Sequence, residues 1–131
     1  MICVGETLEE RRAGRLVEVI DRQLASALTG LQAGSAFMVA YEPVWAIGTG
    51  ETATPGDATE AHGVLRERLA NDLAPDRAAD VPILYGGSVK PENAADLMSA
   101  PEVDGVLVGG ASLAPESFAR ISEAGGAVGA D

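Results

Sequence analysis

Four short apolar runs alternate along the chain with longer segments in which apolar residues recur every third or fourth position. The runs cover residues 1–4, 37–41, 81–85 and 103–108. Continuous apolar runs of this length are typical of parallel strands that are buried on both faces. Their alternation with helical patterns predicts an α/β fold with a parallel sheet and right-handed crossovers.

A helix is predicted after each of the first two runs. Thr7 and Glu10 form a capping-box pattern, which predicts one helix of about six turns that ends between residues 30 and 34. Thr54 and Pro55 predict the start of the next helix, and Pro75 lies just past its expected end. The expected buried stripes of the two helices are Leu16, Ile20, Leu24 and Leu28, and Ala58, Ala61, Leu65, Leu69 and Leu73.

Two shorter helices are predicted in the second half, one opening at Pro91 and one over residues 115–122. We expect residues 1–123 to form four strand-helix units and residues 124–131 to be a flexible tail. A closed eight-stranded barrel needs roughly 250 residues, so 131 residues hold about half of one. Alternation alone does not separate part of a barrel from a doubly wound sheet.

Composition narrows the choice of partners and compartment. The 20 acidic and 9 basic residues give a net charge of -11, which disfavours nucleic acid and anionic membranes as partners. No apolar stretch approaches the roughly 18 residues of a membrane span, and no basic-then-apolar leader opens the sequence. The lone Cys3 excludes an internal disulfide, and we expect a cytoplasmic protein.

The first candidate for chemistry is Glu42, which follows the apolar run 37–41. At a strand end a carboxylate can act as a general base if a closing loop removes water from it. Pro43 stiffens the exit of the strand, and the apolar segment 44–47 leads to a glycine-rich stretch, which predicts such a lid. The alternative for a glutamate in isolation is a solvated residue at a loop edge.

Two glycine corners, Gly86-Gly87-Ser88 and Gly109-Gly110, end the last two predicted strands. Glycine lets backbone N–H groups approach an anion, and a following helix adds attraction for negative charge. Two such corners on adjacent strands predict a shared phosphate site. Each corner alone is also compatible with a plain tight turn.

Three segments, Cys3 to Thr7, Tyr41 to Gly50 and Tyr85 to Ser112, resemble the carboxyl-terminal half of the triosephosphate isomerase family. The resemblance implies the fifth to eighth units of a TIM (β/α)8 barrel, here an incomplete one. It implies an isomerase of glycolysis and gluconeogenesis that interconverts D-glyceraldehyde 3-phosphate and dihydroxyacetone phosphate by proton transfer through an enediolate, without cofactor or metal.

The resemblance also implies roles for individual residues. Glu42 would be the catalytic base, and Gly48, Ser88, Gly109 and Gly110 would bind the substrate phosphate. Trp45 would move with the lid and lie near Glu6, while Tyr85 and Ser88 would steady the closed lid.

The family's electrophilic histidine, and the asparagine and lysine of its first unit, belong to a front half that these 131 residues do not match. His62 is expected to be a helix-surface or packing residue, Lys90 a solvated lysine and Cys3 a packing residue. We therefore expect the isolated chain to be inactive.

Three hypotheses follow for the function of the chain. It is part of a full isomerase, or a non-catalytic phosphate-binding half-barrel that needs a partner chain, or another phosphate-binding barrel enzyme. The family is typically homodimeric, and we expect this half to self-associate or to need the missing half because its sheet has unpaired edges.

Overall fold

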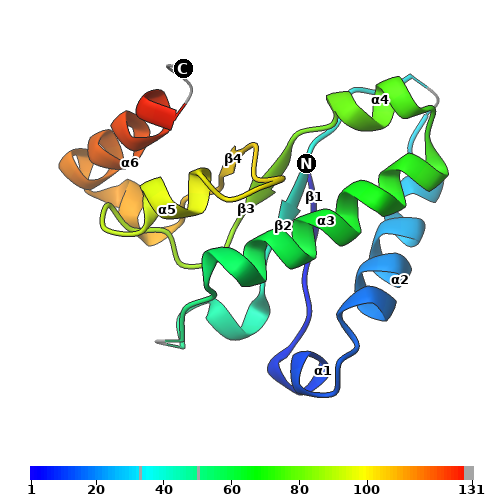
Figure 1. Ribbon diagram of the computed structural model, residues 1–131, viewed down its shortest axis with the longest axis horizontal. Helices are drawn as coiled ribbons and strands as arrows, with labels where there is room; N and C mark the ends of the chain where they lie inside the picture. The colour runs from blue at the N-terminus through cyan, green and yellow to red at the C-terminus, as the bar shows by residue number, and fades with distance from the viewer. Residues whose placement is uncertain (33, 50, 129–131) are drawn as a thin grey trace.

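The computed structural model describes residues 1–32, 34–49 and 51–128, and a parallel sheet lies at the centre of this part (Figure 1). Its four strands follow the order of the chain, β1-β2-β3-β4, and all neighbouring pairs are parallel. The predicted parallel sheet is therefore confirmed. The strands are shorter than the apolar runs: β1 Ile2–Val4, β2 Val39–Tyr41, β3 Ile83–Tyr85 and β4 Gly105–Val106.

Helices follow every strand, as the alternation predicts. Contacts join α2 to β1, and α3 to both β2 and β3, so these two helices cover the first part of the sheet, while α5 and α6 pack together beside β4 (Figure 1). The helices are α1 Leu8–Arg12, α2 Leu16–Thr29, α3 Pro55–Asp72, α4 Pro75–Asp80, α5 Ala94–Met98 and α6 Pro115–Val128, with two 3-10 turns, η1 Val44–Ala46 and η2 Gly110–Leu113.

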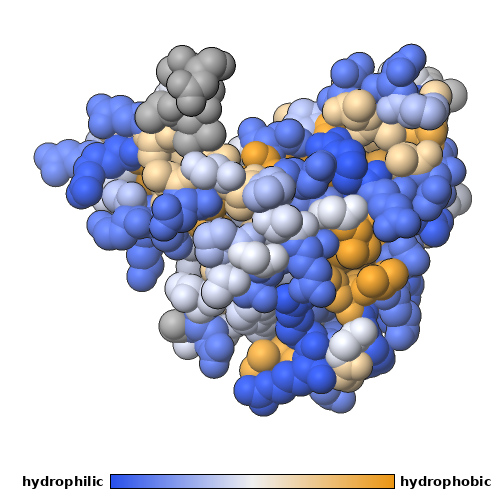
Figure 2. All heavy atoms as spheres, in the orientation of Figure 1, coloured by the Kyte–Doolittle hydropathy of each residue, from blue (hydrophilic) through white to orange (hydrophobic). Residues whose placement is uncertain are grey.

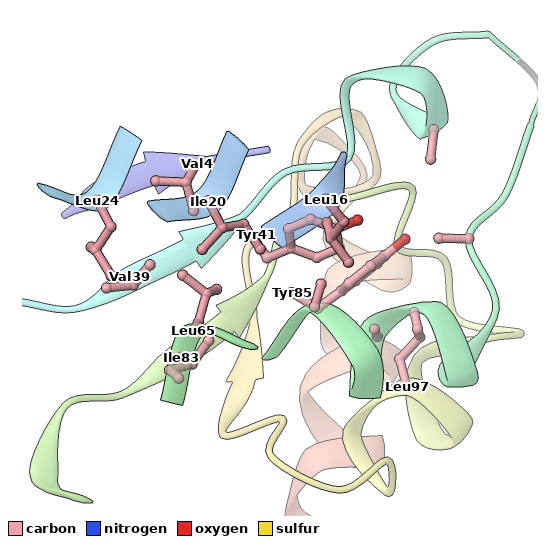
Figure 3. Packing of buried hydrophobic residues seen from close by; sticks show 14 of the residues in the cluster. Val4, Leu16, Ile20, Leu24, Val39, Tyr41, Leu65, Ile83, Tyr85 and Leu97 are labelled. Carbon is pink, nitrogen blue, oxygen red and sulfur yellow. The ribbon is translucent and has the colours of Figure 1, made fainter. Parts of the chain in front are cut away.

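The hydrophobic core lies between the sheet and the helices (Figure 3). Val4, Tyr41 and Tyr85 stand side by side in the sheet register and point toward the helices. Most of the predicted helix stripes lie in this core, whereas Leu28 and Leu73 are only partly buried. The core residues of the two long helices are Leu16, Ile20, Leu24, Ala58, Ala61, Leu65 and Leu69.

The opposite face of the sheet is less well covered. It carries the alternate positions of the same register, where Ala40 is buried, Leu84 is half-buried and Cys3 is exposed. The expectation that Cys3 is a packing residue is therefore wrong, because no strand in the described part of the chain lies beyond β1 on its outer side. In a closed barrel this face lines the interior and is filled by layers of side chains from several strands. The open inner face is what half of a barrel would present.

The prediction of one continuous helix after β1 is wrong. The Thr7–Glu10 capping box forms, but α1 ends at Arg12 and a separate helix, α2, begins at Leu16. Gly14 lies between them with φ +69°, a backbone conformation that interrupts a right-handed helix and that glycine adopts at low cost. α1 buries none of its residues, so no apolar pattern marks its end.

Pro75 lies just past the end of α3 at Asp72, as predicted, and it also begins the short helix α4, which was not predicted. Two other boundaries differ from the prediction. α5 begins at Ala94, three residues after Pro91. α6 continues to Val128, beyond the predicted end at residue 122 and into the expected tail. Its last turns are supported because Ala124 packs against the core and Gly125 lies close to Met98 of α5. Residues 129–131 of the expected tail lie outside the described residues.

The surface reflects the acidic composition. Figure 2 shows hydrophilic residues over most of the visible face, with hydrophobic residues in small groups between them. None of the helices in the described part of the chain combines the length and apolar composition that a membrane span requires.

Candidate functional site

Glu42 stands at the carboxyl end of β2, one residue past Tyr41. Its backbone N–H donates to the Val4 carbonyl at 2.7 Å, so it continues the pairing of β2 with β1. Its side chain is half-buried. The backbone of Glu42 is thus fixed by the sheet, while its carboxylate remains accessible from the carboxyl ends of the strands.

Two glycines on the neighbouring strands confine Glu42. A Cβ on Gly86 would lie 2.8 Å from Cγ of Glu42, and a Cβ on Gly5 would overlap the Glu42 carbonyl oxygen. Glycine in a strand often marks such a close approach of another chain segment. Burial and then the charge of Glu42 raise the pKa of the Cys3 thiol.

The first glycine corner follows β3 directly. Gly86 donates its N–H to the Tyr41 carbonyl at 2.7 Å, and both Gly86 and Gly87 are buried. Asn93 holds the next part of the turn, since its Nδ2 donates to the Ser88 carbonyl at 2.9 Å and its Oδ1 accepts from the Lys90 N–H at 2.8 Å. The position of Ser88 is therefore set by a side chain five residues later.

The second corner follows β4. Gly109 and Gly110 are exposed, and Gly110 opens η2. The N–H and Oγ of Ser112 both donate to the Gly109 carbonyl, at 2.9 and 2.6 Å. A Cβ on Gly110 would meet no atom within 4 Å, so packing inside the chain does not require glycine there.

One pocket of about 600 Å³ brings the predicted site residues together. Glu42, Gly48, Ser88, Gly109 and Gly110 all line it. The remaining lining residues come from the same strand ends and from the loop after β2: Ile47, Gly86, Gly87, Val89, Lys90, Leu107, Val108 and Ala111. A carboxylate and two glycine corners thus face one space.

The charge in this pocket is nearly balanced. Glu42 and the exposed Lys90 are the only ionisable residues that line it among the described residues. An anion in the pocket would therefore be held mainly by backbone N–H groups, which glycine leaves accessible.

Residues 43–54, which connect β2 to α3, form what we call the lid segment; residue 50 lies outside the described residues. Val44 and Ile47 in this segment are about half exposed. Trp45 donates its Nε1–H to Glu6 Oε1 at 2.9 Å, in agreement with the expected proximity of the two residues. Gly48 has φ +69°, a conformation that favours glycine.

Glu6 is completely buried and accepts two hydrogen bonds. Besides Trp45, the hydroxyl of Tyr41 donates to its Oε1 at 2.9 Å. Burial and then the charge of Glu6 raise the pKa of Tyr41 above its ordinary range. Tyr85 is also buried, and its hydroxyl has no hydrogen-bond partner among the described residues; burial raises its pKa to about 12.

The structure separates His62 from the pocket. The imidazole is buried in α3, its Nδ1 lies 2.9 Å from the Glu102 carbonyl, and its ring meets Tyr41 edge-on at 5.9 Å. It is a packing residue, which agrees with one of the two alternatives predicted. Among the described residues, no group of three or more His, Cys, Asp or Glu side chains is arranged to hold a metal ion.

Sequence reasoning did not assign a role to several residues that shape the site. Gly5 lies within the segment Cys3 to Thr7, but nothing there marks its close approach to Glu42, and Asn93 lies in a turn before a short helix. Arg11 connects Glu6 with residues of α3 that are 46 or more positions away in sequence. The signal available for Asn93 is its type, because Asn side chains often bond to nearby backbone in turns.

Comparisons with known proteins point to one family. The family model described as "Triosephosphate isomerase" matches residues 1–125. Proteins named triosephosphate isomerase are similar to the chain in Moorella thermoacetica (55% identity over 123 residues), Nitratidesulfovibrio vulgaris (54% over 124 residues) and Roseiflexus castenholzii (53% over 124 residues).

These alignments cover 92% of the chain but only 48–49% of each relative. The chain therefore spans about half the length of the curated relatives that it matches.

Proposed function

The chain belongs to the triosephosphate isomerase family, and we propose that it supplies the proton-transferring and phosphate-binding half of that enzyme's active site. The substrate would be a triose phosphate, interconverted between D-glyceraldehyde 3-phosphate and dihydroxyacetone phosphate. The shared pocket of Glu42, Gly48, Ser88, Gly109 and Gly110 is the observation that carries this proposal.

In this reaction Glu42 acts as the base. Its carboxylate takes a proton from the carbon beside the carbonyl group, and the electrons of that C–H bond form the double bond of an enediolate. In that step the carbonyl π electrons move onto the carbonyl oxygen. The same carboxyl group then returns the proton to the adjacent carbon, and the proton of the substrate hydroxyl group passes to the former carbonyl oxygen, so the net change is a shift of the carbonyl by one carbon. General base catalysis by a positioned carboxylate contributes about 10²–10⁴-fold to a rate.

The two glycine corners bind the phosphate group. Gly109 and Gly110 at one strand end, and Ser88 at the next, line the pocket that Glu42 also lines. Their backbone N–H groups and the Ser88 hydroxyl would be the phosphate ligands. Gly48 of the lid segment lines the same pocket and would complete the cradle. Holding the phosphate this way fixes the reacting carbons relative to the carboxylate.

The carbonyl oxygen also needs a hydrogen-bond donor in the transition state. His62 is buried away from the pocket, and Lys90 is the only cationic side chain that lines it among the described residues. The family's electrophilic histidine belongs to the half of the barrel that the chain does not match. We therefore propose that this half alone has background activity and becomes active when the front half completes the barrel.

A second candidate is a phosphate-binding half-barrel without catalysis. The observation in its favour is the sheet itself: β1 and β4 are its edges, and Cys3 and Leu84 leave its inner face incompletely covered. Unpaired edges favour association with another chain. Self-association, the dimeric state of the whole enzyme and a cytoplasmic location stay predictions.

One experiment separates the two candidates. The chain is purified alone and together with the front half of a relative, such as that of Moorella thermoacetica, and isomerase turnover is measured in both samples. We expect turnover only in the mixture. Phosphate binding without turnover in a well-folded mixture would favour the non-catalytic half-barrel, and turnover by the chain alone would contradict the need for a front half.

A further inference from the structure

The two ends of the lid segment are held by two different carboxylates. Trp45, near its beginning, bonds to Glu6, and Thr54, at its end, bonds to Asp57. Glu6 precedes α1, whereas Asp57 lies in the first turn of α3. These anchors are far apart in sequence, and a third residue lies between them in space.

Glu6 fixes the beginning of the lid segment through both its side chain and its backbone. Its Oε1 accepts from Trp45 Nε1 at 2.9 Å, and its carbonyl accepts from the Val44 N–H at 3.1 Å. Thr49 then donates its Oγ1–H to the Trp45 carbonyl, which ties the middle of the segment to the same anchor. The placement of η1 therefore depends on where Glu6 lies.

Asp57 fixes the end of the segment through the capping box of α3. Its Oδ2 accepts from both the N–H and the Oγ1–H of Thr54 at 2.8 Å, and its own N–H donates back to Thr54 Oγ1 at 3.1 Å. Burial opposes ionisation, but the hydrogen bonds from Thr54 and Arg11 outweigh it and lower the pKa of Asp57. The second oxygen, Oδ1, takes no part in the cap and accepts from Arg11.

Arg11 lies between these two carboxylates. Its Nη2 donates to Asp57 Oδ1 at 2.6 Å and to Glu60 Oε2 at 2.7 Å, while its Nη1 is 3.9 Å from Glu6 Oε1. The Arg11 side chain is 19% exposed and that of Glu6 is fully buried. Arg11 is the only basic residue paired with Glu6 in the described part of the chain.

We infer that Arg11 is a positioning residue that couples the two ends of the lid segment, reaching Trp45 by way of Glu6 and Thr54 by way of Asp57. A planar guanidinium suits this place because its several N–H donors point in fixed directions to more than one carboxylate. Without it, Glu6 would be a buried charge with no cation beside it, and Asp57 and Glu60 would be left facing each other. The segment would then lose the link that makes its ends move together.

The test uses the single tryptophan of the chain, since Trp45 fluorescence reports only on η1. Emission and acrylamide quenching are compared in the unaltered chain, Arg11→Met, Arg11→Lys, Asp57→Asn and the neighbouring control Arg12→Met, at matched oligomeric state and matched far-UV circular dichroism. For Arg11→Met we expect a red shift and a quenching constant that rises about twofold as η1 loosens. Arg11→Lys should show a smaller red shift and a smaller rise in quenching than Arg11→Met. Arg12→Met should match the unaltered chain.

Asp57→Asn is the decisive variant because Asp57 does not contact Trp45, and asparagine can still cap α3. We expect it to shift Trp45 emission in the same direction as Arg11→Met. Unchanged Trp45 emission in a folded Asp57→Asn variant would overturn the coupling. The same emission and quenching in Arg11→Met as in Arg12→Met would also overturn it. If Arg11→Met does not fold, Asp57→Asn alone decides.

The coupling does not rest on the proposed function, since the fluorescence is measured without ligand. A chain that shows the coupling yet binds no inorganic phosphate would count against the proposed function only. A chain that binds phosphate while Asp57→Asn leaves Trp45 unchanged would count against the coupling only.

Discussion

Gly86 lies against the side chain of Glu42, so closely that a Cβ on residue 86 would stand 2.8 Å from Glu42 Cγ. Gly5 makes the corresponding approach on the other neighbouring strand, against the Glu42 carbonyl. Because β1 and β3 flank β2 in the sheet, the two glycines confine Glu42 from both sides. Gly5 thus leaves room for the backbone of Glu42 and Gly86 leaves room for its side chain.

The first prediction concerns Gly5. Gly5→Ala should lower the free energy of unfolding by about 2 kcal/mol or more, because the new methyl group would overlap the Glu42 carbonyl and force β1 and β2 apart. Urea denaturation measures this change. Gly63→Ala is the matched control: nothing lies within 4 Å of its Cβ position in α3, so it should stabilise the chain by about 0.5–1 kcal/mol. Equal effects of the two substitutions would contradict the close approach at Gly5.

A second prediction separates ligand binding from packing. In Gly110→Ala the added Cβ meets no protein atom within 4 Å, so the free energy of unfolding should change by less than about 0.5 kcal/mol. The same methyl group would lie beside the backbone N–H groups proposed to bind phosphate, and the affinity for inorganic phosphate should fall by about tenfold. Phosphorus NMR titration measures this affinity. Unaltered affinity would show that this corner does not hold the anion, and Gly63→Ala serves again as the control.

The order of strands and helices could be predicted from the sequence because the apolar periodicity depends only on neighbours along the chain. The break between α1 and α2 could not, since α1 buries no residue and its end leaves no apolar signal. β4 pairs with β3 alone and is shorter than its apolar run, as the other strands are.

The candidate site could likewise be predicted only in part from the sequence. Glu42 and the two glycine corners stand at strand ends, where parallel topology brings them to one edge, so the pocket follows from the predicted sheet. The contacts of Arg11 with Asp57 and of Gly5 with Glu42 join residues from different units. Such contacts depend on how the helices and strands pack, which periodicity within one segment does not encode.

A third prediction tests the base itself. In the mixture of this chain with a front half from a relative, Glu42→Gln should lower the turnover number by about 10²–10⁴-fold, since an amide cannot accept the proton. Binding of inorganic phosphate should persist, because the glycine corners are unchanged. Glu51→Gln is the control: Glu51 is exposed, carries the same charge and lies outside the pocket lining. A comparable loss of turnover in both variants would contradict the assignment of Glu42.

The last prediction concerns acid stability and His62. Burial, only partly offset by the hydrogen bond to the Glu102 carbonyl, lowers the pKa of this imidazole from its ordinary value of 6.5. The folded chain therefore keeps His62 neutral where the unfolded chain already binds a proton, so the free energy of unfolding should fall as the pH drops below 6.5. Urea denaturation at a series of pH values between about 7.5 and 5 measures the slope, above the range in which most carboxylates titrate.

His62→Asn isolates this contribution. Its amide can still donate to the Glu102 carbonyl. The variant should be less stable at neutral pH by about 1–3 kcal/mol, because packing against Tyr41 is lost. Its free energy of unfolding should nevertheless depend less on pH below 6.5. The sign of the effect distinguishes burial from an ion pair, because a histidine paired with a carboxylate would stabilise the fold more as the pH falls. A steeper slope in His62→Asn than in the unaltered chain would therefore contradict a neutral, buried imidazole in α3.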